Sequence, residues 1–274
     1  MGSKLILNIP HASTWITGVH CIPAVHIAAA YGAFLKMLYK ELLPMTDWYT
    51  DELFINGVGI PIVAPVSRII CDTERFRNDK EEPMAKIGFG VCYSKTHDLN
   101  HNIYWKEGHQ DWVLHNLYDI HHRNLELAVD RAIDEFGRAL ILDCHSFSPD
   151  PLPYEPDQTS KRPDICIGTD SFHTPTELVE MTEEFFKSRG YSVLVNSPYS
   201  GTMVPLKHLN SKKTLASIML EINRDLYLKS GTNEKTDDFF HVKKLIADYE
   251  NEILRFKDYR LYSPETEKDV IGKT

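Results

Sequence analysis

Two apolar runs of this chain each end at a histidine, and they constrain the fold more than any other feature. The first run, residues 5–9, is followed by Pro10 and His11, and the second, residues 139–142, leads to His145. Apolar runs that stop at an ionisable residue predict buried strands that deliver it to the carboxyl edge of a sheet, where α/β sheets bind ligands. Either histidine alone is more often a packed side chain, but together they suggest a shared metal ion with a carboxylate as third ligand.

The rest of the chain alternates short apolar runs with amphipathic segments, as in a sheet covered by helices. We expect strands at residues 4–9, 62–71, 139–144, 164–168, 192–195 and 215–222. We expect helices at residues 24–43, 111–136, 176–188 and 237–256. The predicted fold class is therefore α/β, with a mixed, mostly parallel sheet flanked by helices in three layers.

No linker or shift in composition divides the chain, so we expect a single domain over residues 1–274 with a polar tail from about residue 262. The sequence holds 39 acidic and 30 basic residues, giving a net charge of −9. This charge argues against binding to nucleic acid or to an anionic membrane surface. An anionic substrate would therefore need a locally positive site. The oligomeric state is left open.

The five scattered cysteines include no CxxC pair, which predicts reduced thiols and a cytoplasmic protein. No apolar run approaches the roughly 18 residues of a membrane helix. No signal peptide is expected, because the chain enters its first predicted strand directly. Cys144 should point away from the face of His145, because side chains alternate along a strand.

A segment at residues 47–54 places carboxylates among aromatic residues. A carboxylate in apolar surroundings costs several kcal/mol unless it is paired or metal-bound. Asp51 or Glu52 is therefore a candidate third ligand, the alternative being a solvated helix or strand end. A His/carboxylate/His set leaves the fourth position of a tetrahedral zinc ion open for water.

Three further features suggest substrate chemistry. Arg75 follows an apolar run and suits a substrate carboxylate, although pairing with a neighbouring carboxylate is an equal alternative; for Arg68 the structural role is favoured. Glu221 interrupts the apolar run 215–222, where it either pairs or acts as a general base. The segment 196–201 is either a plain turn or a loop that places a phenol near the site.

In this order, these segments resemble the N-formylglutamate amidohydrolase family, whose members are zinc hydrolases on a carboxypeptidase-like α/β fold. The resemblance is carried by Ile9-Pro10-His11, Asp47-Trp48 with Asp51, Ser67-Arg68 with Asp72 and Arg75, Asp143-Cys144-His145-Ser146, Asp164-Ile165 with Gly168-Thr169, Asn196 with Pro198-Tyr199 and Gly201, and Glu221-Ile222-Asn223-Arg224 with Tyr227.

The resemblance implies a set of site residues. The zinc ligands would be His11, Asp51 and His145, with Glu52 as the rival of Asp51, and Glu221 would be the general base. Arg75 and Arg224 would hold substrate carboxylates, Arg68 would shape the same pocket, and Asn196 and Tyr199 would also contact substrate.

The resemblance implies hydrolysis of the amide of a small anionic N-acyl amino acid, with one zinc ion per chain. N-formyl-L-glutamate, cleaved to glutamate and formate, is the expected substrate. Two departures, Glu74 where the family commonly has asparagine and Thr202 where a second glycine is usual, motivate a different N-acyl amino acid or a peptide as the alternative. A non-catalytic binding module on the same fold is the alternative of another class.

Overall fold

The computed structural model describes residues 3–16 and 28–256, so the predicted tail from residue 262 lies outside the described part. Six strands form one sheet in the order β2-β1-β3-β6-β4-β5. Their bounds are β1 (Leu5–Ile9), β2 (Ile60–Val63), β3 (Ala139–Phe147), β4 (Ile165–Gly168), β5 (Val193–Val195) and β6 (Leu215–Asn223). All neighbouring strands are parallel except β4 and β6, which confirms the mixed, mostly parallel sheet.

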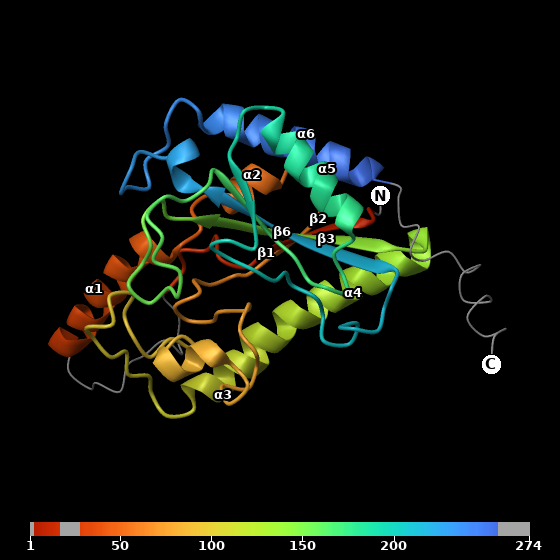
Figure 1. Ribbon diagram of the computed structural model, residues 1–274. Coiled ribbons are helices and arrows are strands. Elements are labelled where there is room, and N and C mark those ends of the chain that lie inside the picture. The colour runs from red at the N-terminus through yellow and green to blue at the C-terminus, as the bar shows by residue number, and fades with distance from the viewer. Residues whose placement is uncertain (1–2, 17–27, 257–274) are drawn as a thin grey trace.

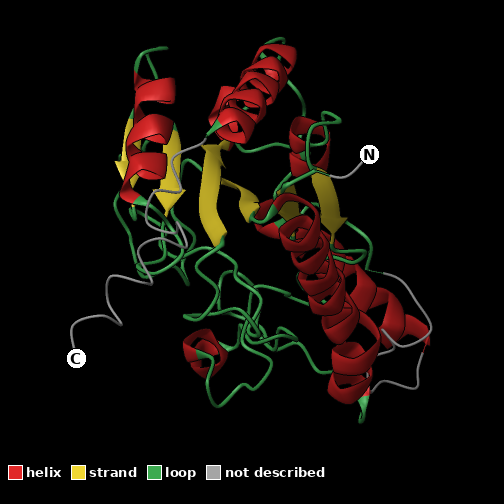
Figure 2. Cartoon of the chain, turned by 90° about the vertical axis from the view of Figure 1, so that its right-hand side faces the viewer, coloured by secondary structure: helices red, strands yellow, loops and turns green. Residues whose placement is uncertain are grey.

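Helices lie on both faces of the sheet, as Figure 1 shows, and Figure 2 shows the strands in a row between them. The helices are α1 (Ala28–Met45), α2 (Thr50–Phe54), α3 (His109–Val113), α4 (Asp119–Phe136), α5 (Thr176–Lys187) and α6 (Phe239–Arg255). A π-helical turn at Leu114–Tyr118 joins α3 to α4, and short 3₁₀ helices lie at Pro83–Ile87 and Arg224–Leu226. Helices α2, α5 and α6 cover one face, whereas α4 packs on β1, β2 and β3 from the other.

Alternation along β3 and β6 decides which side chains reach the site. Leu142, Cys144 and Leu220 are buried in the apolar core that includes residues of α2, α5 and α6. The residues that alternate with them along the strands face the opposite side, and Asp143, His145, Met219 and Glu221 line a cavity there. The strands therefore place a dry core on one face and polar chemistry on the other, and Cys144 belongs to the core, as expected.

The predicted strand at residues 62–71 is only partly correct. Only β2 pairs with the sheet, and the chain then turns, with the amide of Ile70 donating to the carbonyl of Ser67. Val66, Ile69 and Ile70 are buried in a second apolar cluster that includes residues of α1. A buried segment outside the sheet has the same apolar sequence as a buried strand. The hydrophobic pattern of residues 62–71 therefore does not distinguish the two structures.

None of the helices in residues 3–16 and 28–256 is long and apolar enough to cross a membrane.

The core beneath α6 contains one carboxylate with an unusual environment. Glu250 is fully buried, one of its oxygens accepts a hydrogen bond from Asn56 Nδ2 at 3.4 Å, and the other has no hydrogen-bond partner among the described residues. Burial raises the pKa of Glu250 from 4.5 to about 8.

This pKa predicts a loss of stability as the pH rises from about 4.5 to about 8, because the unfolded chain releases a proton that the folded chain retains. Glu250→Gln should remove this loss, so that its free energy of unfolding relative to the wild type rises by about 4 kcal/mol between pH 5 and pH 9. Urea unfolding at several pH values measures the difference. Glu252→Gln, an exposed position on the same helix, is the matched control and should show no such trend. A parallel pH dependence for Glu250→Gln and the wild type would contradict the assignment.

Candidate metal centre and cavity

His11, Asp47 and His145 come together at the carboxyl edge of the central strands. One potential ligand atom of each lies within 4.8 Å of the others, and all three residues are buried. Asp47 Oδ2 lies 3.1 Å from His145 Nδ1 and 3.5 Å from His11 Nδ1. The two histidines follow or end parallel neighbouring strands, β1 and β3, which brings them to one place as the sequence predicted.

A second carboxylate lies behind each imidazole. His11 Nε2 is 2.8 Å from Asp72 Oδ1, and His145 Nε2 is 3.1 Å from Asp143 Oδ1. A hydrogen bond donated by each Nε2–H group to its carboxylate leaves both Nδ1 atoms with a free lone pair that faces Asp47. The Nδ1 atom of His11 is buried and forms no hydrogen bond to any described residue. The three residues therefore fit a metal ion, which would satisfy this atom.

Asp47 is held ionised by its neighbours. Burial alone would raise the pKa of this carboxyl group, but its interactions with His11 and His145 outweigh burial and hold the pKa well below the ordinary value. Its second oxygen accepts a hydrogen bond from Arg224 at 3.2 Å. A deprotonated, oriented carboxylate is the form that coordinates a metal.

The structure corrects the expected third ligand. The amide of Asp47 donates to the carbonyl of His11 at 3.0 Å, which places its side chain beside that histidine. Helix α2 begins at Thr50, and there Asp51 accepts a hydrogen bond from the amide of Glu52, whose own carboxylate pairs with Lys235 at 2.6 Å. Neither Asp51 nor Glu52 belongs to the group around His11 and His145.

Glu221 lies beside His145, because the two residues are register partners on the parallel strands β3 and β6. It is buried, and its Oε2 atom has no hydrogen-bond partner in the described part of the chain. Burial raises the pKa of Glu221 to about 8, with Asp47 adding to the effect and His145 opposing it. An unpartnered carboxylate at this position can accept a proton once a nearby cation lowers its pKa.

Asn8 connects β1 to the metal centre. Its Nδ2 group donates to Asp143 Oδ1 and to Glu74 Oε1, both at 2.8 Å, and its Oδ1 accepts from His121 Nε2 at 3.0 Å. His121 is buried, and burial lowers its pKa to about 3. Asn8 could have been identified from the sequence, because it is a polar residue within the apolar run 5–9, just as Glu221 is within the run 215–222.

Glu74 and Asp143 also form a group of potential ligand atoms with His145. In that group Asp143 is already the hydrogen-bond partner of both His145 and the amide of Met203. Burial and the nearby Asp143 raise the pKa of Glu74 to about 8. We therefore interpret these carboxylates as support for His145 rather than as a second metal site.

The three predicted arginines all line the cavity, but they are engaged to different degrees. Arg68 donates to Tyr93 at 2.7 Å and to Asp72 at 3.0 Å. Arg224 donates to Asp47, to the side chain and carbonyl of Ser146, and to the carbonyl of Pro44. Among the described residues, the side chain of Arg75 makes only an ion pair, in which its Nε atom lies 3.3 Å from Asp72 Oδ2.

Of the two residues of the segment 196–201 that were expected to contact substrate, one lines the cavity and the other does not. Tyr199 lines the cavity, and its hydroxyl group donates to Glu155 at 2.8 Å and accepts from Arg162 at 2.8 Å. Asn196 does not line the cavity, because its side chain is bound to Thr169 through two hydrogen bonds of 2.8 and 2.9 Å. Asn196 therefore joins the ends of β4 and β5 rather than contacting a bound molecule.

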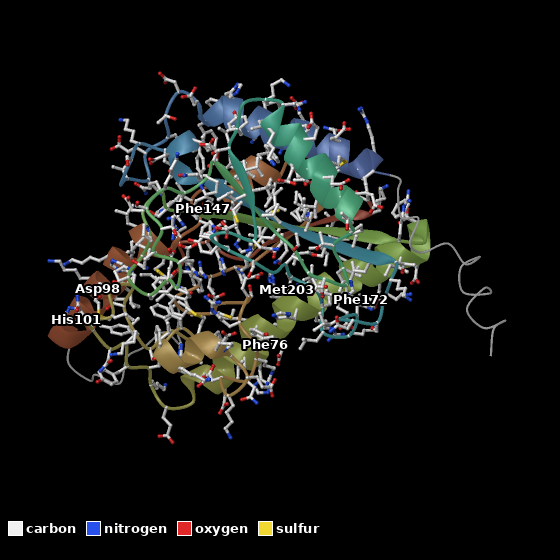
Figure 3. The ribbon with its side chains drawn as sticks, in the orientation of Figure 1. Phe76, Asp98, His101, Phe147, Phe172 and Met203 are labelled. Carbon is white, nitrogen blue, oxygen red and sulfur yellow. The ribbon has the colours of Figure 1, made fainter. Side chains whose placement is uncertain are left out.

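The residues of the metal centre line a cavity of about 630 Å³. Phe76, Phe147 and Met203, which are labelled in Figure 3, come from distant segments of the chain and line the same cavity. Arg75 and Glu221 also line it, so an anion-binding group and a proton acceptor share one space with the histidines. Such a concave, largely apolar space with a few converging polar groups is typical of a small-molecule site.

Comparison with known proteins agrees with this arrangement. The profile of the family described as N-formylglutamate amidohydrolase matches residues 3–228. The N-formylglutamate deformylase of Pseudomonas putida is 26% identical over 252 residues, which cover 88% of this chain and 86% of that protein. The crystal structure of the N-formylglutamate amidohydrolase of Ralstonia eutropha has a TM-score of 0.73 at 20% identity, covering 92% of this chain and 93% of that one.

A gene product of Agrobacterium tumefaciens has a TM-score of 0.61 at 17% identity, with 92% of each chain covered. At these identities the two solved structures establish the α/β fold. The profile match extends over most of the sequence and includes every residue of the metal centre. The chain therefore belongs to the N-formylglutamate amidohydrolase family.

Proposed function

We propose that this chain is a zinc-dependent amidohydrolase that cleaves the amide of an N-acyl amino acid. The convergence of His11 Nδ1, His145 Nδ1 and the Asp47 carboxylate beside Glu221 is the observation that carries the proposal. N-formyl-L-glutamate, which would give glutamate and formate, is the reference substrate because the family and the Pseudomonas putida relative are named for it. A cytoplasmic location remains a prediction from the cysteines.

His11, Asp47 and His145 offer two nitrogen donors and one oxygen donor, a set that zinc accepts while leaving a position for water or substrate. When bound, such an ion polarises a carbonyl group and lowers the pKa of a bound water molecule. Asp72 and Asp143 support the site by fixing the proton on Nε2 of each histidine.

Glu221 is the proton acceptor in this proposal. It takes a proton from the attacking water molecule and returns it to the nitrogen atom of the leaving amine, acting first as base and then as acid. Its burial excludes bulk water, and the charge of a cation bound at the adjacent histidines would favour its ionised form. Arg75, whose terminal nitrogens are not hydrogen-bonded to described residues, is the group proposed to hold the substrate carboxylate.

Asp47→Asn should lower the zinc content from about one ion per chain to well below that and reduce turnover at least about 100-fold, because it removes a charged ligand. Asp51→Asn, four residues along the chain, is the matched control and should keep both properties. Mass spectrometry of protein purified without chelator measures the metal. If only the Asp51→Asn variant loses zinc, Asp51 rather than Asp47 is the third ligand.

Glu221→Gln should retain zinc while the kcat for amide hydrolysis falls about 100- to 10,000-fold, because glutamine keeps the shape of the side chain but cannot accept the proton. Metal analysis of the same preparation accompanies the assay. Glu252→Gln, exposed on α6, should leave kcat unchanged. Full turnover in zinc-loaded Glu221→Gln, or inactivity explained by missing zinc, would remove Glu221 from the role of base.

A further inference from the structure

We infer that the cavity takes N-acyl amino acids that carry a single carboxylate and a sizeable apolar group, in preference to dicarboxylates such as N-formyl-L-glutamate. The inference rests on the proposed amide hydrolysis and names the substrate class for it. Three features of the cavity carry it: the number of available cations, the excess of carboxylates and the apolar wall.

One guanidinium group is available to a ligand. Arg224 is held by Asp47, Ser146 and Pro44 through four hydrogen bonds. Arg68 is held by hydrogen bonds to Tyr93 and Asp72. Arg75 alone of the three has terminal nitrogens that make no hydrogen bond within the described chain, and it lines the cavity. A single planar guanidinium group binds one carboxylate in the bidentate geometry. Arg75 can therefore bind the α-carboxylate of a substrate but not a second carboxylate as well.

Carboxylates outnumber guanidinium groups on the cavity wall. The wall includes six acidic side chains and three arginines, and each arginine is paired with a carboxylate of the protein, Arg75 through its Nε atom alone. Even with a divalent ion at the metal centre, the wall carries no excess positive charge. A second substrate carboxylate would have to lose its water shell without a cationic partner among these residues, which is unfavourable.

The wall away from the metal centre is apolar and partly open. Phe76 and Leu206 line the cavity and remain 46% and 62% exposed. Met84, Leu152 and Met203 line the same cavity. Large apolar side chains that remain exposed beside a cavity favour a ligand that covers them.

The volume of the cavity agrees with this assignment. A formyl group has about the size of two water molecules, or roughly 60 Å³. The cavity of about 630 Å³ leaves ample room for a larger group next to Phe76 and Leu206. The apolar group can belong to the amino-acid side chain or to the acyl group, since both extend from the amide that is cleaved, and the experiment distinguishes these two sources.

The test compares kcat/KM of the zinc-loaded full chain for four substrates: N-formyl-L-glutamate, N-formyl-L-glutamine, N-formyl-L-leucine and N-hexanoylglycine. Glutamine matches glutamate in size without the second charge, so this pair isolates the effect of charge. We expect N-formyl-L-leucine or N-hexanoylglycine to exceed N-formyl-L-glutamate at least about tenfold, with glutamine between them. A preference for leucine places the apolar group on the side chain, and a preference for hexanoylglycine places it on the acyl group. Glutamate hydrolysed as fast as, or faster than, both apolar substrates overturns the inference.

Phe76→Ser should lower kcat/KM for the preferred apolar substrate about tenfold and change the value for N-formyl-L-glutamine little, because it removes apolar surface from the wall. Phe240→Ser, 76% exposed on α6, is the matched control and should change neither value. Equal losses for both substrates in Phe76→Ser would show that Phe76 does not select the apolar group and would contradict the inference.

Binding separates this inference from the proposed function. The zinc-loaded Glu221→Gln variant should bind the four compounds in the same order without cleaving them, and calorimetry measures their Kd values. If the wild type hydrolyses none of the four, the proposed function fails, while the binding order still decides the inference. Tighter binding of N-formyl-L-glutamate than of both apolar compounds overturns it.

Discussion

The site depends on the hydrogen bond that each histidine forms with a buried carboxylate behind it. Asp72 and Asp143 are fully buried, and each accepts a hydrogen bond from the Nε2–H group of one histidine. Burial alone would raise the pKa of Asp72, but Arg68 and Arg75, followed by His11, hold it well below the ordinary value. These ionised carboxylates fix the tautomer of each imidazole, so that two Nδ1 atoms converge on one point before any ion arrives.

The sheet makes this convergence possible. Strands β1, β3 and β6 are parallel neighbours, so their carboxyl ends meet at one edge and the side chains of one face lie side by side. Asn8 bridges β1 and β3 on that face through Asp143, while Glu221 is the register partner of His145. The opposite face of the same strands packs apolar side chains beneath α5 and α6, and this packing anchors the backbone that carries the polar residues.

The fold class and the strand-borne residues could be predicted because their information is local. Each of these apolar runs predicts a strand, and the polar residue that ends or interrupts it, His11, His145 or Glu221, lies within a few residues of the same run. Asp47 was missed because the backbone bond to His11 that orients it spans distant segments of the chain. The engagement of Arg68 and Arg224 with Asp72 and Asp47 is likewise a matter of tertiary contact, which no spacing in the sequence reveals.

The same contacts connect the metal centre to the choice of substrate. Arg68 donates to Asp72, and Arg224 donates to Asp47. A guanidinium group whose terminal nitrogens are bound to protein oxygens is not free to bind a substrate carboxylate. The likeness of this chain to the Ralstonia eutropha enzyme at 20% identity extends to the fold, and a shared fold is compatible with many distributions of charge in a cavity. In the proposed site, the choice of substrate therefore depends on which guanidinium groups keep free nitrogens beside Asp47 and Asp72, and among the described arginines of the cavity Arg75 is the one whose terminal nitrogens make no hydrogen bond.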